Sequence, residues 1–246
     1  MGYFCKRNSY QTLTKKYIFY IFLCFTLLSI LFCSNASVFA FATGDDVVIT
    51  PPSVGYTIVV DPGHGGIDPG SIGYKTKVKE SELNLKFSLM LAEKLRAVVI
   101  RFIMTRTDDS SLASGLTGKA FKKEDMRLRK EMINRLRPNM VISLHMNSYT
   151  NHVLRGAKVF YDKTSEISRG IAESIQNQFA ENLEASNNVA SVGDYYMLKC
   201  TESPSVICEC GFLSNARDEQ LLLDEKYQEK IVDCIFKGII NFLNIS

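Results

Sequence analysis

Two of the three histidines in this 246-residue chain lie where apolar segments end in loops. His64 follows the β-branched run 56–61 in a glycine-rich turn, and His145 ends the apolar run 140–145. A single histidine is usually a structural or surface residue, but two at strand ends, one among glycines that allow close backbone approach, are typical of metal ligands. His152 lies in a polar stretch and is interpreted as a surface histidine.

Two glutamates are candidates for the same site. Glu80 opens a predicted helix after the loop 70–79, where it either returns to the site or is a solvated first-turn residue near the helix N-terminus. Glu209 lies inside the apolar segment 206–213, where a charge is costly unless it is paired or coordinated. Two histidines and one glutamate form a usual catalytic zinc set, and a second carboxylate can act as general base and acid.

Several other chemistries lack support in the sequence. The turn after residue 61 resembles a phosphate-binding loop, yet neither Gly-x-Gly-x-x-Gly nor Gly-Lys-Ser/Thr follows it. No Gly-x-Ser-x-Gly elbow indicates a serine hydrolase. The first 42 residues hold four of the 29 basic side chains, so the rest carries 25 basic against 26 acidic groups. A nucleic-acid binder normally presents a basic face, and this balance argues against one.

The cysteines do not form a disulfide framework. Four of the seven lie beyond the first 42 residues, with no dense or regular spacing, at positions 200, 208, 210 and 234. Cys208 and Cys210 are two apart on a predicted strand and point to the same face, a poor geometry for bridging each other. We interpret them as buried apolar thiols rather than as a metal-binding pair.

The elements that position these residues alternate between strands and helices. Strands are expected at 56–61, 99–105, 140–145, 156–161, 195–198 and 205–210. Helices are expected at 82–98, 125–136, 167–183 and 227–243. Residues 115–124 are expected to form a loop, with Asp125 capping the next helix and Pro138 ending it. The pattern predicts an α/β fold, a three-layer sandwich with a central, mostly parallel twisted sheet flanked by helices.

The N-terminal segment has the properties of an export signal. Lys15 and Lys16 precede the uncharged run 17–44, whose first half is densely apolar. The run is long enough to span a bilayer uncleaved, although Ala40-Phe-Ala42 resembles a cleavage site. We expect an exported protein, with a membrane anchor favoured over a cleaved signal. The expected organisation is a signal or anchor at 1–42, a linker at 43–55 and a catalytic domain at 56–246.

Four sequence blocks occur in an order that resembles a known family. They are Val59-Val-Asp-Pro-Gly-His-Gly-Gly66 with Asp68-Pro-Gly70, Glu80-Ser-Glu-Leu-Asn-Leu85, Ser143-Leu-His-Met-Asn147 and Glu209-Cys-Gly-Phe-Leu-Ser-Asn215. Over about 56–243 the chain is similar to the zinc-dependent N-acetylmuramoyl-L-alanine amidases. The resemblance implies Zn²⁺ as cofactor, with His64, Glu80 and His145 as metal ligands. It also implies that Glu209 is the catalytic carboxylate.

Within this family the chain is more similar to the sporulation and germination amidases of spore-forming bacteria. The basic anchor, the stretch 117–129 and Tyr195-Tyr-Met-Leu198 carry that resemblance. It implies cleavage between the lactyl group of N-acetylmuramic acid and L-alanine of the stem peptide in spore-cortex peptidoglycan, as a step toward muramic-δ-lactam. Cys208 and Cys210 replace the usual aliphatic residues, and we expect that these thiols make the enzyme sensitive to oxidation or excess metal.

The sequence also bears on how the activity is controlled and leaves two alternative functions open. Family members often carry wall-binding repeats or an inserted inhibitory helix, and neither is found in this sequence. Activity is then controlled by the timing of expression, by zinc occupancy or by an accessory protein. Such a protein, controlling activity or zinc occupancy, is one candidate partner, besides peptidoglycan and the membrane. The rivals are a non-catalytic peptidoglycan-binding module of the same fold and another zinc peptidase or deacetylase.

Overall fold

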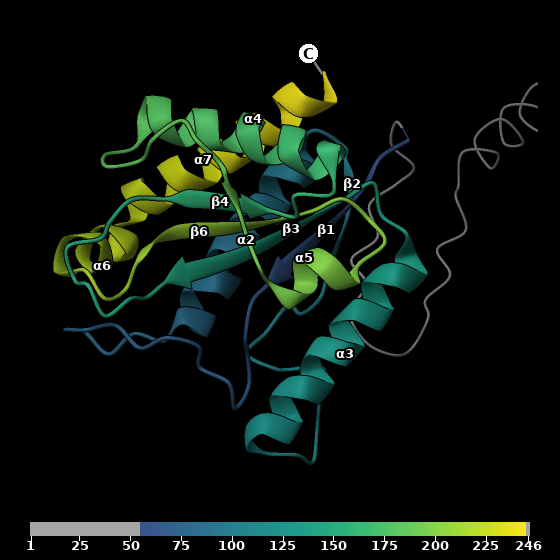
Figure 1. The fold of residues 1–246 in the computed structure, drawn as a ribbon, viewed down its shortest axis with the longest axis horizontal. Helices are drawn as coiled ribbons and strands as arrows, with labels where there is room; N and C mark the ends of the chain where they lie inside the picture. The colour runs from purple at the N-terminus through teal and green to yellow at the C-terminus, as the bar shows by residue number, and fades with distance from the viewer. Residues whose placement is uncertain (1–54, 245–246) are drawn as a thin grey trace, which may run out of the picture. The chain divides into compact units, whose positions relative to one another are not determined.

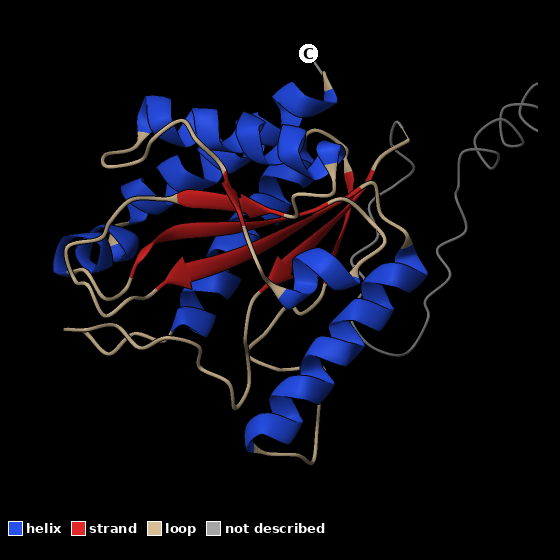
Figure 2. Cartoon of the chain, viewed as in Figure 1, coloured by secondary structure: helices blue, strands red, loops and turns tan. Residues whose placement is uncertain are grey.

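The computed structural model describes residues 55–244, and a six-stranded sheet forms their centre (Figures 1 and 2). The strands are β1 Thr57–Pro62, β2 Arg101–Met104, β3 Met140–Asn147, β4 Lys158–Tyr161, β5 Ser191–Val192 and β6 Ser205–Phe212. Their order is β2-β1-β3-β6-β4-β5, and only the β4–β6 pair is antiparallel in this part of the chain. The mostly parallel sheet predicted from the sequence is confirmed.

Helices cover both faces of the sheet (Figure 1). One face carries α2 Glu80–Ala97, α4 Glu166–Asn182 and α7 Glu225–Leu243, and the other carries α3 Gly118–Leu136 and α5 Tyr196–Cys200. The short helix α6 Ala216–Leu223 follows β6 and packs against α7. The three-layer α/β sandwich is therefore confirmed.

Strand alternation divides the interior into two cores. Even-numbered side chains of β1, β3 and β6 enter the large core under α2, α4 and α7; they include Ile58, Val60, Ile142, Leu144, Val206 and Cys208. Val59 and Val141, at odd positions, pack with Ile133 of α3 and Met197 of α5. Successive strand residues point to opposite faces, so the polar odd-numbered residues that follow also lie on the α3 and α5 side.

Three sequence-based expectations about elements are wrong. Residues 118–124 are helical, so Asp125 lies inside α3 and its carboxylate accepts a hydrogen bond from the Leu112 amide at 2.8 Å instead of capping the helix. Residues 196–200 form α5 rather than a strand, because four apolar residues are too few to distinguish the two periodicities. The short elements β5 and α6 were not predicted.

The predicted leader and most of the predicted linker lie outside the described residues. Within residues 55–244, no helix has both the length and the apolar character needed to cross a bilayer.

Helix α2 ends in a turn that favours glycine but contains valine. Val99 has φ +58°, and its amide donates to the carbonyl of Arg96 while the Ile100 amide donates to that of Leu95. These two bonds and the left-handed residue define a Schellman motif. A β-branched side chain is strained in this conformation.

Replacing Val99 by Gly is expected to raise the free energy of unfolding by about 0.5–1 kcal/mol, because relief of left-handed strain outweighs the added freedom of the unfolded chain. Urea unfolding followed by circular dichroism measures it. The matched control is Val98→Gly, which should destabilise the protein because Val98 has an ordinary φ of −103°. A Val99→Gly protein less stable than the parent would contradict the strain.

Candidate metal centre

The turn after β1 places His64 at the carboxyl edge of the sheet. His64 has φ +62°, a left-handed conformation, and two backbone hydrogen bonds between Gly65 and Asp68 close the loop that follows. A Cβ on Gly63 would overlap the imidazole of His145, so only glycine permits the turn to approach β3 this closely. The sequence of this turn thus brings one imidazole against the other.

Two buried arginines hold the carbonyl groups of this turn. Arg129 of α3 donates to the carbonyls of Pro62 and His64 at 2.9 and 2.6 Å. Arg106 donates to the carbonyls of Pro62 and Gly63 at 3.1 and 3.0 Å. Both side chains are buried, so the turn cannot relax without leaving charged donors unsatisfied.

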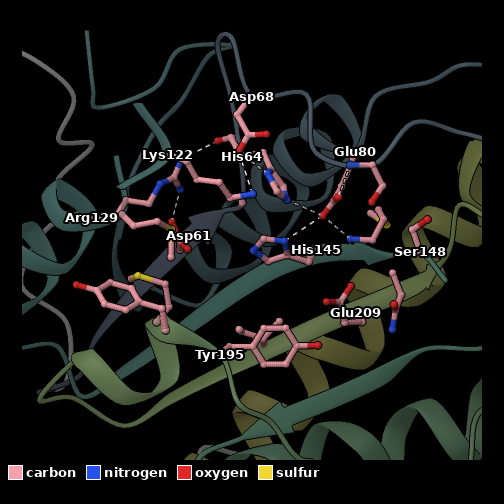
Figure 3. Close-up of a pocket in the computed structure, with 18 of the residues that line it drawn as sticks. Asp61, His64, Asp68, Glu80, Lys122, Arg129, His145, Ser148, Tyr195 and Glu209 are labelled. Atoms are coloured by element: carbon pink, nitrogen blue, oxygen red, sulfur yellow. Dashed lines mark hydrogen bonds and ion pairs between the residues drawn. The ribbon is translucent and has the colours of Figure 1, made fainter. Parts of the chain in front are cut away.

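Arg129 is itself held by two buried carboxylates. It lies 2.6 Å from Asp61 and 2.7 Å from Asp125 (Figure 3 shows Asp61 and Arg129 side by side). Burial alone would raise the pKa of Asp61, but Arg129 and the hydroxyl hydrogen bonds from Thr105 and Ser143 lower it to about 2. Asp61 is therefore ionised and compensates the buried guanidinium.

Glu80 lies between the two histidines. Its Oε1 is 3.2 Å from His64 Nε2 and 3.0 Å from His145 Nδ1, and Figure 3 shows these three groups converging. Glu80 is the first residue of α2 and is buried, so the solvated first-turn alternative is wrong. The Glu80 carboxylate also accepts hydrogen bonds from the amides of Ser71 and Met146 at 2.7 and 3.2 Å, which fix its orientation.

Asp68 orients His64. Its Oδ2 is 2.8 Å from His64 Nδ1, which leaves Nε2 facing Glu80. Burial alone would lower the pKa of His64, but hydrogen bonds to Asp68 and Glu80 raise it to about 9. A carboxylate behind an imidazole is the common outer-sphere arrangement of metal-binding histidines.

The side chains of His64, Glu80 and His145 fit a metal ion. One ligand atom from each lies within 4.8 Å of the others, and two imidazoles with one carboxylate form a donor set that suits Zn²⁺. Both imidazoles already contact the Glu80 carboxylate, so a metal would replace contacts between groups that are in place.

Glu209 lies beside this cluster on the neighbouring strand. It is the register partner of His145 in the β3–β6 pair, and its odd position puts it on the same face of the sheet. Its Oε2 is buried and has no hydrogen-bond partner among the described residues. Burial, reinforced by the charge of Glu80, raises the pKa of Glu209 to about 7. A carboxyl group with this pKa can both accept and return a proton near neutral pH.

These side chains line a pocket of about 480 Å³. Tyr195, at the start of α5, forms part of its wall near Glu209 (Figure 3). Burial and the charge of Glu209 raise the pKa of Tyr195 to about 12, so its phenol stays protonated and can donate a hydrogen bond. Lys122 lies at the pocket mouth, 3.8 Å from Asp68.

The structure brings together all four residues predicted from the sequence, and it keeps His152 apart, where its Nδ1 contacts the carbonyl of Ser214. Cys208 and Cys210 are buried free thiols in the large core, facing away from Glu209. Burial raises the pKa of both, which argues against the expected sensitivity to oxidation. The sequence analysis assigned no role to Asp68 or Arg129. The contact of Asp68 with His64 had one sequence signal, because Asp68 follows His64 by four residues in the same turn.

Comparison with known proteins decides the family. The model of the N-acetylmuramoyl-L-alanine amidase family matches residues 58–241, which include every residue of this site. The chain belongs to this amidase family. The germination-specific N-acetylmuramoyl-L-alanine amidase of Bacillus subtilis is 34% identical to it over 194 residues, 78% of this chain and 81% of that protein.

Solved structures agree with this membership. The CwlD amidase of Clostridioides difficile, solved in complex with the GerS lipoprotein, is 37% identical with a TM-score of 0.74, over 78% of this chain and 100% of that chain. The catalytic domain of the amidase CwlV from Paenibacillus polymyxa is 26% identical with a TM-score of 0.68, over 78% of this chain and 99% of that chain. The amidase fold described above is thus shared along most of its length.

Replacing Arg129 by Met in this amidase is expected to lower the free energy of unfolding by about 3–5 kcal/mol, because Asp61 and Asp125 lose their buried cation. Denaturant unfolding measures the loss. The matched control is Arg127→Met, two residues earlier on α3, where an exposed arginine pairs with Glu124 and little change is expected. Equal losses in the two variants would show that the buried network does not carry the stability assigned to it.

Proposed function

We propose that this protein is a zinc-dependent N-acetylmuramoyl-L-alanine amidase of spore-cortex peptidoglycan. It would hydrolyse the amide between the lactyl group of N-acetylmuramic acid and L-alanine, as a step toward muramic-δ-lactam. The observation that carries the proposal is the cluster of His64, Glu80 and His145 beside the unpartnered carboxylate of Glu209, in a chain of this family. A non-catalytic wall-binding module needs no such buried carboxylate.

The proposed mechanism assigns a role to each of these residues. The metal ligands would be His64, Glu80 and His145. The Zn²⁺ that they hold would act as a Lewis acid on the scissile carbonyl and lower the pKa of a water molecule. Glu209 accepts the proton of the attacking water and returns it to the leaving nitrogen of L-alanine. Asp68 keeps the coordinating nitrogen of His64 directed into the site.

The cellular setting is part of the same proposal. We infer from the predicted N-terminal segment and the wall substrate that the domain acts outside the cytoplasm, anchored to the membrane or secreted, facing the spore cortex. The C. difficile amidase was solved with a lipoprotein, and this supports an accessory protein that controls activity or zinc occupancy here too.

Mass spectrometry of peptidoglycan digests tests the proposed reaction. The full-length protein, with and without added zinc, is incubated with cortex peptidoglycan. Zinc-dependent release of intact stem peptides beginning with L-alanine is expected. Cleavage within the stem peptide would indicate a zinc peptidase, and loss of acetyl groups would indicate a deacetylase. Intact stems with zinc bound would favour the binding module.

Replacing His64 by Ala is expected to lower the affinity for zinc by at least about tenfold, because one of three protein ligands is removed. Zinc content after dialysis against a competing chelator measures it. His152→Ala is the matched control and should retain zinc, since His152 lies outside the cluster. Undiminished zinc in His64→Ala would remove His64 from the ligand set.

Replacing Glu209 by Gln is expected to leave zinc bound while kcat falls by about 10²–10⁴-fold, because the amide cannot accept the proton of water. Zinc content and stem-peptide release are measured on the same sample. The exposed Glu202→Gln is the control and should be fully active. An active Glu209→Gln enzyme would exclude Glu209 as the general base.

A further inference from the structure

A second hollow adjoins the pocket of the metal centre. It has a volume of about 400 Å³ and shares Ser148 and Tyr149 with that pocket. Its other lining residues are Ile72, Tyr74, Thr150, His152 and Ser214. The hollow therefore lies next to the metal centre, with Ser148 and Tyr149 at the boundary between the two.

The walls of the hollow are held in place by the segment after β6. The amide of Tyr74 donates to the carbonyl of Leu213 at 3.1 Å, and the amide of Tyr149 donates to the hydroxyl of Ser214 at 3.0 Å. His152 Nδ1 is 2.6 Å from the carbonyl of Ser214. Two loops far apart in sequence are thus fixed to one strand end, and the surface between them is formed before any ligand binds.

The hollow presents exposed aromatic rings. Its described lining residues include no aspartate, glutamate, lysine or arginine. Tyr74 and Tyr149 are 55% and 61% exposed, and the rings of Tyr74 and His152 lie 5.0 Å apart. Aromatic side chains with a polar tip offer both an apolar face and hydrogen-bonding groups. A pyranose ring has the complementary character, because its C–H faces are apolar and its hydroxyls are polar.

The two sides of the pocket differ in charge. Figure 3 shows Lys122 and Ser148 on opposite sides of the histidine pair, and Ser148 is on the side of the hollow. In the proposed substrate, one arm from the scissile amide is an uncharged glycan and the other is a stem peptide with carboxylates. Lys122, which also lies 3.8 Å from Asp68, can contact a stem-peptide carboxylate on one side, and the aromatic hollow can contact a sugar on the other, which matches these arms in one orientation.

We propose that this hollow, formed around Tyr74, Tyr149 and His152, is a saccharide subsite that binds a sugar of the glycan strand next to the muramic acid being processed. The inference rests on the proposed amidase function and adds the orientation of its substrate. Both tyrosine rings are exposed, so their removal should not unfold the protein.

Kinetics on substrates of two glycan lengths test the subsite. The full-length protein is assayed on a single muramoyl-peptide and on a tetrasaccharide carrying the same peptide. Tyr74 lines the hollow but not the pocket of the metal centre, so Tyr74→Ala is expected to lower kcat/KM on the tetrasaccharide by about tenfold, mainly through KM, and to leave the single muramoyl-peptide unaffected. Tyr149 lines both, so Tyr149→Ala is expected to lower kcat/KM on both substrates and more strongly on the tetrasaccharide. Tyr149→Phe and Tyr74→Phe keep the ring and should retain most of the preference.

A binding measurement separates this inference from the proposed reaction. Titration of peptide-free glycan oligomers into the parent protein should give saturable binding that Tyr149→Ala weakens by a similar factor. Equal losses of kcat/KM on both substrates in Tyr74→Ala would overturn the saccharide subsite even if amidase activity is present. Saturable, tyrosine-dependent glycan binding without stem release would instead contradict the amidase function and retain the subsite.

Discussion

The geometry of the candidate metal centre depends on the buried guanidinium of Arg129. This one group binds the carboxylates of Asp61 and Asp125 and the carbonyls of Pro62 and His64. A left-handed histidine and a buried cation are each unfavourable alone. Together they satisfy one another, because the turn supplies acceptors that the guanidinium needs and the guanidinium holds the turn in the conformation that places His64.

Sheet topology then determines which side chains meet at this edge. Parallel β1, β3 and β6 end together, and the odd positions of all three strands point toward α3 and α5. Asp61, His145 and Glu209 therefore share a face with the turn, while Cys208 and Cys210 enter the opposite core. The same alternation explains how Glu209 can lie between two buried thiols in the sequence. Its side chain lines the pocket, whereas the thiols enter the apolar core.

The layers could be predicted from the sequence because strand periodicity is a local signal. Local motifs also marked His64, His145 and Glu209 as candidates, whereas the assignment of Glu80 as a ligand rested on the family resemblance and stays a prediction. The wrong elements have a physical cause as well. Residues 195–198 are too short a run to show a period, and the Asp125 carboxylate contacts a loop at Leu112 and Arg129 of its own helix instead of capping that helix. The role of Arg129 was equally hidden, since its partners at 61–64 are about 65 positions away. No spacing rule connects such residues, because only the folded chain brings them within hydrogen-bonding distance.

Anomalous diffraction at the zinc absorption edge, using crystals of the zinc-loaded protein, tests the proposed ligand set most directly. We expect one strong peak between the side chains of His64, Glu80 and His145, with the carboxylate of Glu209 beside it but not coordinated. A peak bound by Glu209 in place of Glu80, or a peak at Cys208 and Cys210, would contradict the assignment of ligands and base on which the proposed reaction rests.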